Sequence, residues 1–149
     1  MSVDERANLK LLGKNQEDLK VISAYLQDSI LIIKDTVFLK QNRTFVMIVN
    51  RFMWEDAEKG VFRQNKRIRS AVKFDEVIKV KSRNINQKNK NKLLECLTIK
   101  CSSTFDETYK IKIFFAGDSI ITITSEVIEI TLHDLGKPWQ VKHIPTHKI

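Results

Sequence analysis

The sequence has little of what marks a disordered, disulfide-bonded or membrane-spanning protein. Its 149 residues include only four glycines, two prolines and two cysteines. So little glycine and proline argues against a disordered chain, and two cysteines are too few for a disulfide framework. The longest apolar runs, such as residues 30–33, are far shorter than the roughly 20 residues of a membrane span. Because the polar, acidic N-terminus is also unlike a signal peptide, we expect one cytoplasmic domain, residues 1–149.

The motifs of common enzyme classes are absent as well. All four glycines are isolated, which excludes a P-loop and a dinucleotide fingerprint, and no Gly-x-Ser-x-Gly elbow is present. Cys96 and Cys101 lack the Cys or His neighbours of a metal-ligand set, so we expect buried free thiols, no metal and no cofactor. His143 and His147 have the spacing of a helical metal pair, but Pro145 between them argues against a helix. The sequence leaves enzymatic activity open and favours a binding protein.

The net charge is concentrated in one fifth of the chain. Residues 63–92 hold eleven basic and two acidic side chains, a net charge of +9, whereas the whole chain carries +8. Such a segment favours an acidic partner, with nucleic acid or an acidic protein as first candidates, and an anionic membrane surface is equally compatible. The alternative is compositional, because an AT-rich coding sequence produces abundant Lys, Asn and Ile without selection on charge.

Two stretches of this basic segment alternate as β-strands do. Residues 66–74 turn apolar side chains to one face and basic ones to the other, and residues 77–83 repeat the pattern with Ile78 and Val80 inward. Asp75 and Glu76 predict a turn, so the two strands would pair as a hairpin. Outward positions carry no aromatic residue, which favours contacts with a backbone over base stacking. The candidate polyanion-binding face has six cations: Arg67, Arg69, Lys73, Lys79, Lys81 and Arg83.

The remaining periodicity predicts a mostly antiparallel β protein between two helices. Asn15 has the character of an N-cap for a helix over residues 16–26. Strands are expected over residues 30–33, 36–40, 44–51, 93–101, 108–115 and 120–124, besides the two basic strands. We expect an arm over residues 1–14, a mobile loop over residues 84–92, and a tail over residues 140–149.

A closing helix is expected after the last strand. Ser125 can cap its N-terminus. A helical stripe of apolar residues follows, formed by Val127, Ile128, Leu132 and Leu135. Gly136 has the C′ position and Pro138 comes two residues later, which is the end signal of a helix. The fold class is therefore α+β: a small barrel or a strongly bent sheet, with the element order of pleckstrin-homology-like domains. The alternative is an open sheet with both helices on one face.

A second candidate site lies at the end of the predicted strand over residues 44–51 and just after it. It consists of Asn50, Arg51, Trp54 and Glu55. On one interpretation the cluster forms a small cleft, which would bind a ligand or serve an enzyme-accessory role. On the other it is a structural bulge with an ion pair. The leading hypothesis is a non-enzymatic binding or adaptor domain that uses the candidate polyanion-binding face. A third hypothesis is a structural subunit without polyanion binding, which joins a complex through Trp54 or Trp139. The sequence gives no oligomeric state.

Several segments resemble one uncharacterised alphaproteobacterial family, domain-of-unknown-function family 2948. Tyr25 stands where a His is expected in that family. The resemblance implies a single cytoplasmic domain and brings no activity with it. The segments that carry it are residues 9–12, 25–29, 50–55, 115–117 and 128–139.

Overall fold

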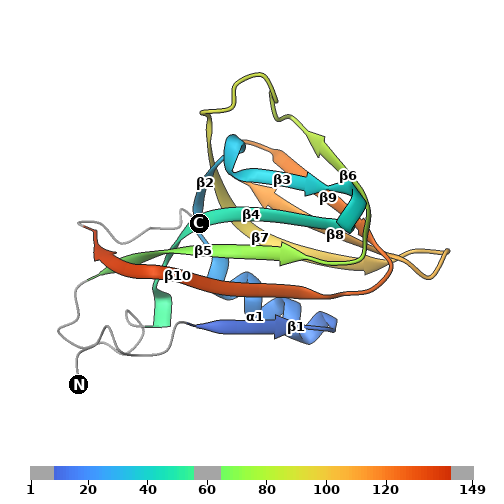
Figure 1. Ribbon diagram of the computed structural model, residues 1–149, viewed down its shortest axis with the longest axis horizontal. Helices are drawn as coiled ribbons and strands as arrows, with labels where there is room; N and C mark the ends of the chain where they lie inside the picture. The colour runs from blue at the N-terminus through green and yellow to red at the C-terminus, as the bar shows by residue number, and fades with distance from the viewer. Residues whose placement is uncertain (1–8, 56–64, 142–149) are drawn as a thin grey trace.

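The computed structural model describes residues 9–55 and 65–141, in which ten strands form one sheet beside a single α-helix (Figure 1). All strand pairs are antiparallel, which confirms the expected mostly antiparallel sheet. No helix in these two ranges is long and apolar enough to cross a membrane. The elements are β1 (Lys10–Gly13), α1 (Gln16–Leu26), β2 (Ile30–Ile32), the 3-10 turn η2 (Ile33–Asp35), β3 (Thr36–Leu39), the 3-10 turn η3 (Lys40–Asn42), β4 (Thr44–Phe52), β5 (Lys66–Phe74), β6 (Val77–Arg83), β7 (Leu93–Ser103), β8 (Tyr109–Phe115), β9 (Ser119–Ser125) and β10 (Ile130–Gln140).

The sheet is strongly bent and is not closed into a barrel. Its strand order is β1-β10-β5-β4-β2-β7-β8-β9-β6, with β3 paired to β4 beside this path. Only Asp75 and Glu76 separate β5, inside one half of the sheet, from β6, at the far edge of the other. Two residues cannot span that many strands of a flat sheet, because neighbouring strands lie about 4.8 Å apart. The sheet therefore bends until its halves face each other, and β6 to β9 slant across the direction of β4, β5 and β10 in Figure 1.

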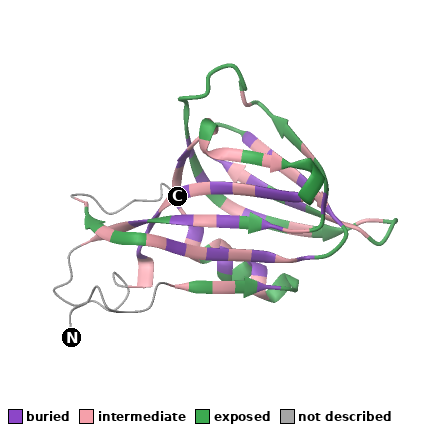
Figure 2. Ribbon diagram, viewed as in Figure 1, coloured by how far each residue is buried: buried purple, intermediate pink, exposed green. Residues whose placement is uncertain are grey.

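The core lies between the two halves. Side chains alternate between buried and more exposed along β5, β8 and β9, and Figure 2 shows this as alternating colours along the ribbons. Met47, Val72, Ile113 and Ile123 are examples of completely or almost completely buried positions. Burial of such side chains contributes about 1.5–3 kcal/mol each and stabilises the bend.

Helix α1 begins where the sequence predicts. The Asn15 side chain accepts a hydrogen bond from the Asp18 N–H at 2.8 Å, which confirms the N-cap. The helix buries Leu19, Ile22 and Leu26 and packs against β7, β1 and β4. Beyond Glu95, no strand of the described part of the chain lies on the β2 side of β7, and α1 covers the edge left there.

The predicted closing helix is wrong, and so is the pleckstrin-homology-like order that depends on it. This stretch is β10, which lies between β1 and β5. Ile130, Leu132 and Asp134 are buried alternately, as in a strand. The helical stripe arose because Leu132 and Leu135 fall at helical spacing, but long-range pairing with β5 overrides that local pattern. Gly136 has a φ of +69°, which a helix C-cap and an irregularity in a strand both require.

The predicted hairpin between residues 66–74 and 77–83 is also wrong. β5 pairs with β4 and β10, whereas β6 pairs with β9. The other predicted strands are confirmed to within about two residues at their ends. The expected arm contributes β1, and the expected tail begins inside β10. Residues 1–8 and 142–149, with the possible metal pair His143 and His147, lie outside the described residues.

Candidate polyanion-binding face

The outer side of β6 carries three of the six predicted cations. Lys79, Lys81 and Arg83 are exposed, and Val77 is buried. The register with β9 shifts between Val77 and Lys79. The prediction that Ile78 points inward is wrong, since the side chain in this irregularity is 48% exposed.

Strand register extends this outer side into a face of three rows. Cross-strand partners share a face of an antiparallel sheet, so the registers of β6, β9, β8 and β7 align four residues per row. The first row is Lys79, Thr124, Lys110 and Ser102; the second is Lys81, Thr122, Lys112 and Lys100; the third is Arg83, Ile120, Phe114 and Thr98. We call these twelve residues the basic face.

The basic face holds six cations and no acidic side chain. None of the six forms an ion pair with another described residue. Lys100 and Lys112 are direct cross-strand partners, an arrangement that destabilises a sheet because like charges repel. An anion on this face would relieve that repulsion.

The face also contains one aromatic ring. Phe114 is half-buried in the third row, and the Lys100 Nζ lies 5.8 Å from its ring centroid. At this distance the ammonium group and the ring attract each other. The sequence-based expectation of no aromatic residue among the cations holds for β5 and β6 but misses this ring on β8.

The other three predicted cations lie in the opposite half of the sheet. The Arg67 Nη1 donates to the carbonyl oxygens of Asp28 at 3.1 Å and Asn50 at 2.9 Å. Burial lowers the pKa of Arg67, against the attraction of Asp28 and Glu95. Its contacts are those of a residue that supports the fold.

Arg69 and Lys73 are exposed on β5, but each has an acidic neighbour. Arg69 lies 3.9 Å from the Asp35 carboxylate and Lys73 lies 3.6 Å from that of Asp75. Neither belongs to the basic face, because β5 lies in the other half of the sheet.

The sequence-based prediction missed three of the six cations of the basic face. Lys100, Lys110 and Lys112 fall outside residues 63–92, in stretches with little net charge. The available signal was alternation, since Lys110 and Lys112 stand between the buried Ile111 and Ile113. The sequence pattern does not indicate which strands lie beside β6.

The second predicted site contains a buried ion network around Arg51. Its Nη1 and Nη2 donate to the two carboxylate oxygens of Glu55 at 2.9 and 2.7 Å. Its Nε and Nη2 donate to the two oxygens of Asp134 at 2.8 and 2.7 Å. Burial by itself would lower the pKa of Arg51, but the hydrogen bonds and charges of Asp134 and Glu55 raise it above its ordinary value.

The remaining members of the second site make structural contacts. The Trp54 indole N–H donates to the Gln27 carbonyl at 2.8 Å, and the Asn50 carbonyl accepts from Arg67. A cavity of about 140 Å³ opens beside Tyr25, Trp54 and Glu55. This volume is below the roughly 300–1,000 Å³ typical of small-molecule sites. The geometry suits an ion network that joins strands.

The two thiols differ in burial. Cys96 is 1% exposed, and burial together with the charge of Asp28 raises its pKa to about 12. Cys101 is half-buried, and burial also raises its pKa. Both are free thiols. In residues 9–55 and 65–141, no three His, Cys, Asp or Glu side chains gather as a ligand set for a metal ion.

Comparison with known proteins gives a match to a family model. The family model described as "Protein of unknown function (DUF2948)" matches residues 9–147. No curated protein and no solved structure matches the chain.

Proposed function

The chain belongs to the DUF2948 family, whose function is unknown, and we propose that it is a binding domain whose basic face holds a nucleic-acid backbone. One observation carries the proposal: three registered rows bring together six cations without an acidic side chain among them. The proposal keeps the cytoplasmic location and the absence of a cofactor that the sequence predicts.

The spacing of the cations suits a polyanion more than a single small anion. Residues two apart on a strand lie roughly 6.6 Å apart, and strands lie about 4.8 Å apart. Lys79 and Lys81 are two apart on β6, as Lys110 and Lys112 are on β8. The cations therefore form an extended array, which can meet several phosphates of one chain at once.

Thr122 and Thr124 separate the two lysine columns. They lie on β9, half-buried, between β6 and β8. Hydroxyl groups contact phosphate oxygens in many nucleic-acid interfaces. Phosphate contacts of this kind carry no sequence information, so we expect tight binding without strong sequence preference.

The test measures binding of purified protein to labelled single-stranded RNA, duplex DNA, polyglutamate and anionic vesicles, each at two salt concentrations. The variant Lys81→Glu with Lys112→Glu reverses two charges in the central row. The matched control, Arg69→Glu with Lys73→Glu, makes the same change of net charge on β5.

We expect nucleic acid to bind the natural protein and the control, but not the central-row variant. With six phosphate contacts, the logarithm of the affinity should fall against the logarithm of salt with a slope of roughly −4 to −5. Equal loss in both variants would mean that net charge alone drives binding. Preference for polyglutamate or vesicles would assign the face to an acidic protein or a membrane surface.

A further inference from the structure

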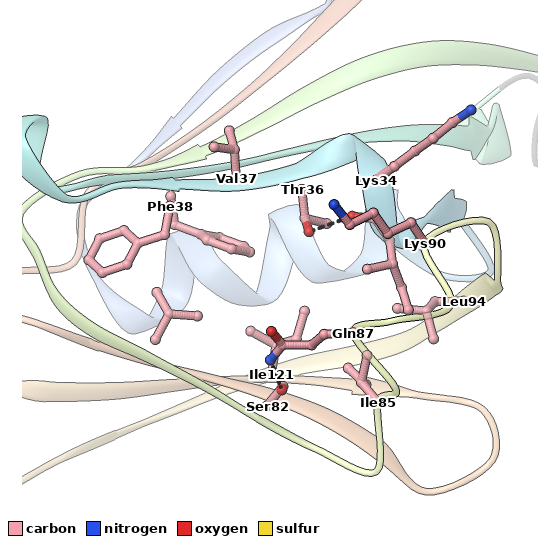
Figure 3. A pocket seen from close by; sticks show the side chains of 13 residues that line it. Lys34, Thr36, Val37, Phe38, Ser82, Ile85, Gln87, Lys90, Leu94 and Ile121 are labelled. Atoms are coloured by element: carbon pink, nitrogen blue, oxygen red, sulfur yellow. Dashed lines mark hydrogen bonds between the residues drawn. The ribbon is translucent and has the colours of Figure 1, made fainter.

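The sheet is open between β3 and β6. At one end β6 is held to the turn between η3 and β4, because the Val77 N–H donates to the Arg43 carbonyl at 2.8 Å. Among the described strands β3 pairs only with β4, and β6 only with β9. A cavity of about 420 Å³ occupies the opening (Figure 3).

The floor and walls of this cavity are mostly apolar. Phe45, Leu94 and Ile121 are almost fully buried core residues at its base. Phe38 from β3 and Ile85 from the loop after β6 are half-buried along its sides. Apolar surface exposed in a concave site is the usual feature of a small-molecule pocket.

The rim supplies charge of one sign only. Lys34 and Lys90 are the charged side chains among the described residues that line the cavity. They come from distant segments, which the hydrogen bond from the Lys34 N–H to the Lys90 carbonyl at 3.0 Å holds together. In Figure 3 the Lys90 side chain reaches back toward Thr36, whereas the Lys34 amine points away from the cavity.

We propose that this opening is a binding site for a small amphiphile with an unbranched apolar chain and an anionic head group. The chain would lie on the apolar floor, and Lys90 would meet the head group beside the Thr36 hydroxyl. The volume corresponds to roughly 14 water molecules at about 30 Å³ each, which suits a ligand of about a dozen non-hydrogen atoms. A medium-chain carboxylate has that size, shape and charge.

This site is separate from the basic face, although both use β6. Side chains alternate across a strand, so Val80 and Ser82 line the cavity while Lys79, Lys81 and Arg83 point outward. A ligand in the cavity and an anion on the basic face therefore do not compete for the same side chains. The two proposals can be tested independently.

The test is calorimetric titration of the protein with decanoate below its micellar concentration. Decyltrimethylammonium, with an unbranched chain of similar length and the opposite charge, is the comparison. We expect saturable binding of one decanoate per chain, and binding of the cation at least tenfold weaker. Equal affinity for the two would overturn the assignment of an anionic head group.

Variants locate the site. Lys90→Glu should weaken decanoate binding at least tenfold, whereas Lys88→Glu, in the same loop but away from the cavity, should leave it unchanged. Ile85→Trp fills the cavity from a loop, where a larger side chain does not break a strand, and should abolish binding. If decanoate binds both Lys90→Glu and Ile85→Trp as it binds the natural protein, the ligand lies elsewhere and the proposal fails.

A second copy of the chain is the rival occupant, because unpaired strand edges can pair between molecules. Val37 is 47% exposed on β3. A dimer in solution that Val37→Lys dissociates, together with no decanoate binding by the natural protein, would overturn the ligand proposal in favour of strand pairing.

Discussion

The Arg51 guanidinium donates two hydrogen bonds to the Asp134 carboxylate, at 2.8 and 2.7 Å, and both side chains are buried. Arg51 lies on β4 and Asp134 on β10, with β5 between them in the sheet. Ser70 of β5 donates to the same carboxylate at 2.7 Å. One carboxylate thus joins three neighbouring strands.

Replacing Asp134 with Ala should therefore destabilise the fold strongly. The change leaves a buried guanidinium with Glu55 as its one remaining carboxylate partner among the described residues. Breaking a buried ion pair costs about 3–5 kcal/mol. Urea denaturation measures the loss in the free energy of unfolding. The double variant Arg51→Met with Asp134→Leu removes both buried charges and should recover much of that loss. A loss below about 1 kcal/mol in Asp134→Ala would show that the pair contributes little.

The edge of β7 depends on one hydroxyl of α1. The Ser23 Oγ accepts the Ile99 N–H at 2.9 Å. Ser23→Ala would leave this N–H without its acceptor, at a cost of about 1–3 kcal/mol. Hydrogen exchange should show faster exchange at Ile99, and Lys20→Ala, on the exposed side of the same helix, should leave that rate unchanged. Unaltered exchange in Ser23→Ala would mean that the helix does not protect this edge.

Gly136 is required by its backbone conformation. A Cβ at this position would meet no atom within 4 Å, so crowding cannot explain a loss of stability. The positive φ costs a residue with a side chain roughly 1–2 kcal/mol. Gly136→Ala should lose about that much in denaturation, and Gly136→Asn should lose less because Asn tolerates this conformation. Equal stability of the Ala variant would mean that β10 relaxes without cost.

The same glycine explains why the sequence predicted a helix where β10 lies. A left-handed glycine followed by Pro138 is the end signal of a helix, but an irregularity in a strand asks for the same conformation. Ile130 and Leu132 alternate correctly for a strand, yet Leu132 and Leu135 also satisfy helical spacing. Only the pairing with β5, more than 50 residues earlier in the chain, decides between them.

Prediction of the site failed for a similar reason. The alternation of Lys79, Lys81 and Arg83 predicts their outward positions correctly, because strand periodicity is local. The strand beside β6 is predicted wrongly, because the two-residue turn at Asp75 and Glu76 favours a hairpin between β5 and β6. The chain instead crosses to the other half of the sheet, where β9 brings β8 and its lysines beside β6.

The two cysteines should react at different rates in the folded protein. With its pKa near 12, Cys96 at pH 8 exists as thiolate in roughly one molecule in ten thousand. Iodoacetamide should modify Cys101 first, as mass spectrometry of the wild type and of Cys101→Ala can show, and both thiols should react in urea. Fast native labelling of Cys96 would contradict its burial.

Cys96 should also make stability depend on pH in the alkaline range. The unfolded thiol loses its proton near pH 9, whereas the folded thiol keeps it up to about pH 12. The folded state then binds more protons, so stability falls as pH rises through this window. The stability difference between the wild type and Cys96→Ala should shrink from pH 9 upward, and a constant difference would argue against the raised pKa.

The cross-strand pair of Lys100 and Lys112 predicts opposite effects on stability and binding. Changing Lys112 to Glu replaces a repulsion with an attraction and should raise the free energy of unfolding by a few tenths of a kcal/mol, up to about 1. Lys112→Thr, which removes only the repulsion, should gain less. Both variants should bind nucleic acid more weakly than the natural protein, with Lys112→Glu the weakest. A side chain that serves only as solvated surface would show the gain in stability without the loss of binding, and that result would remove the central row from the proposed interface.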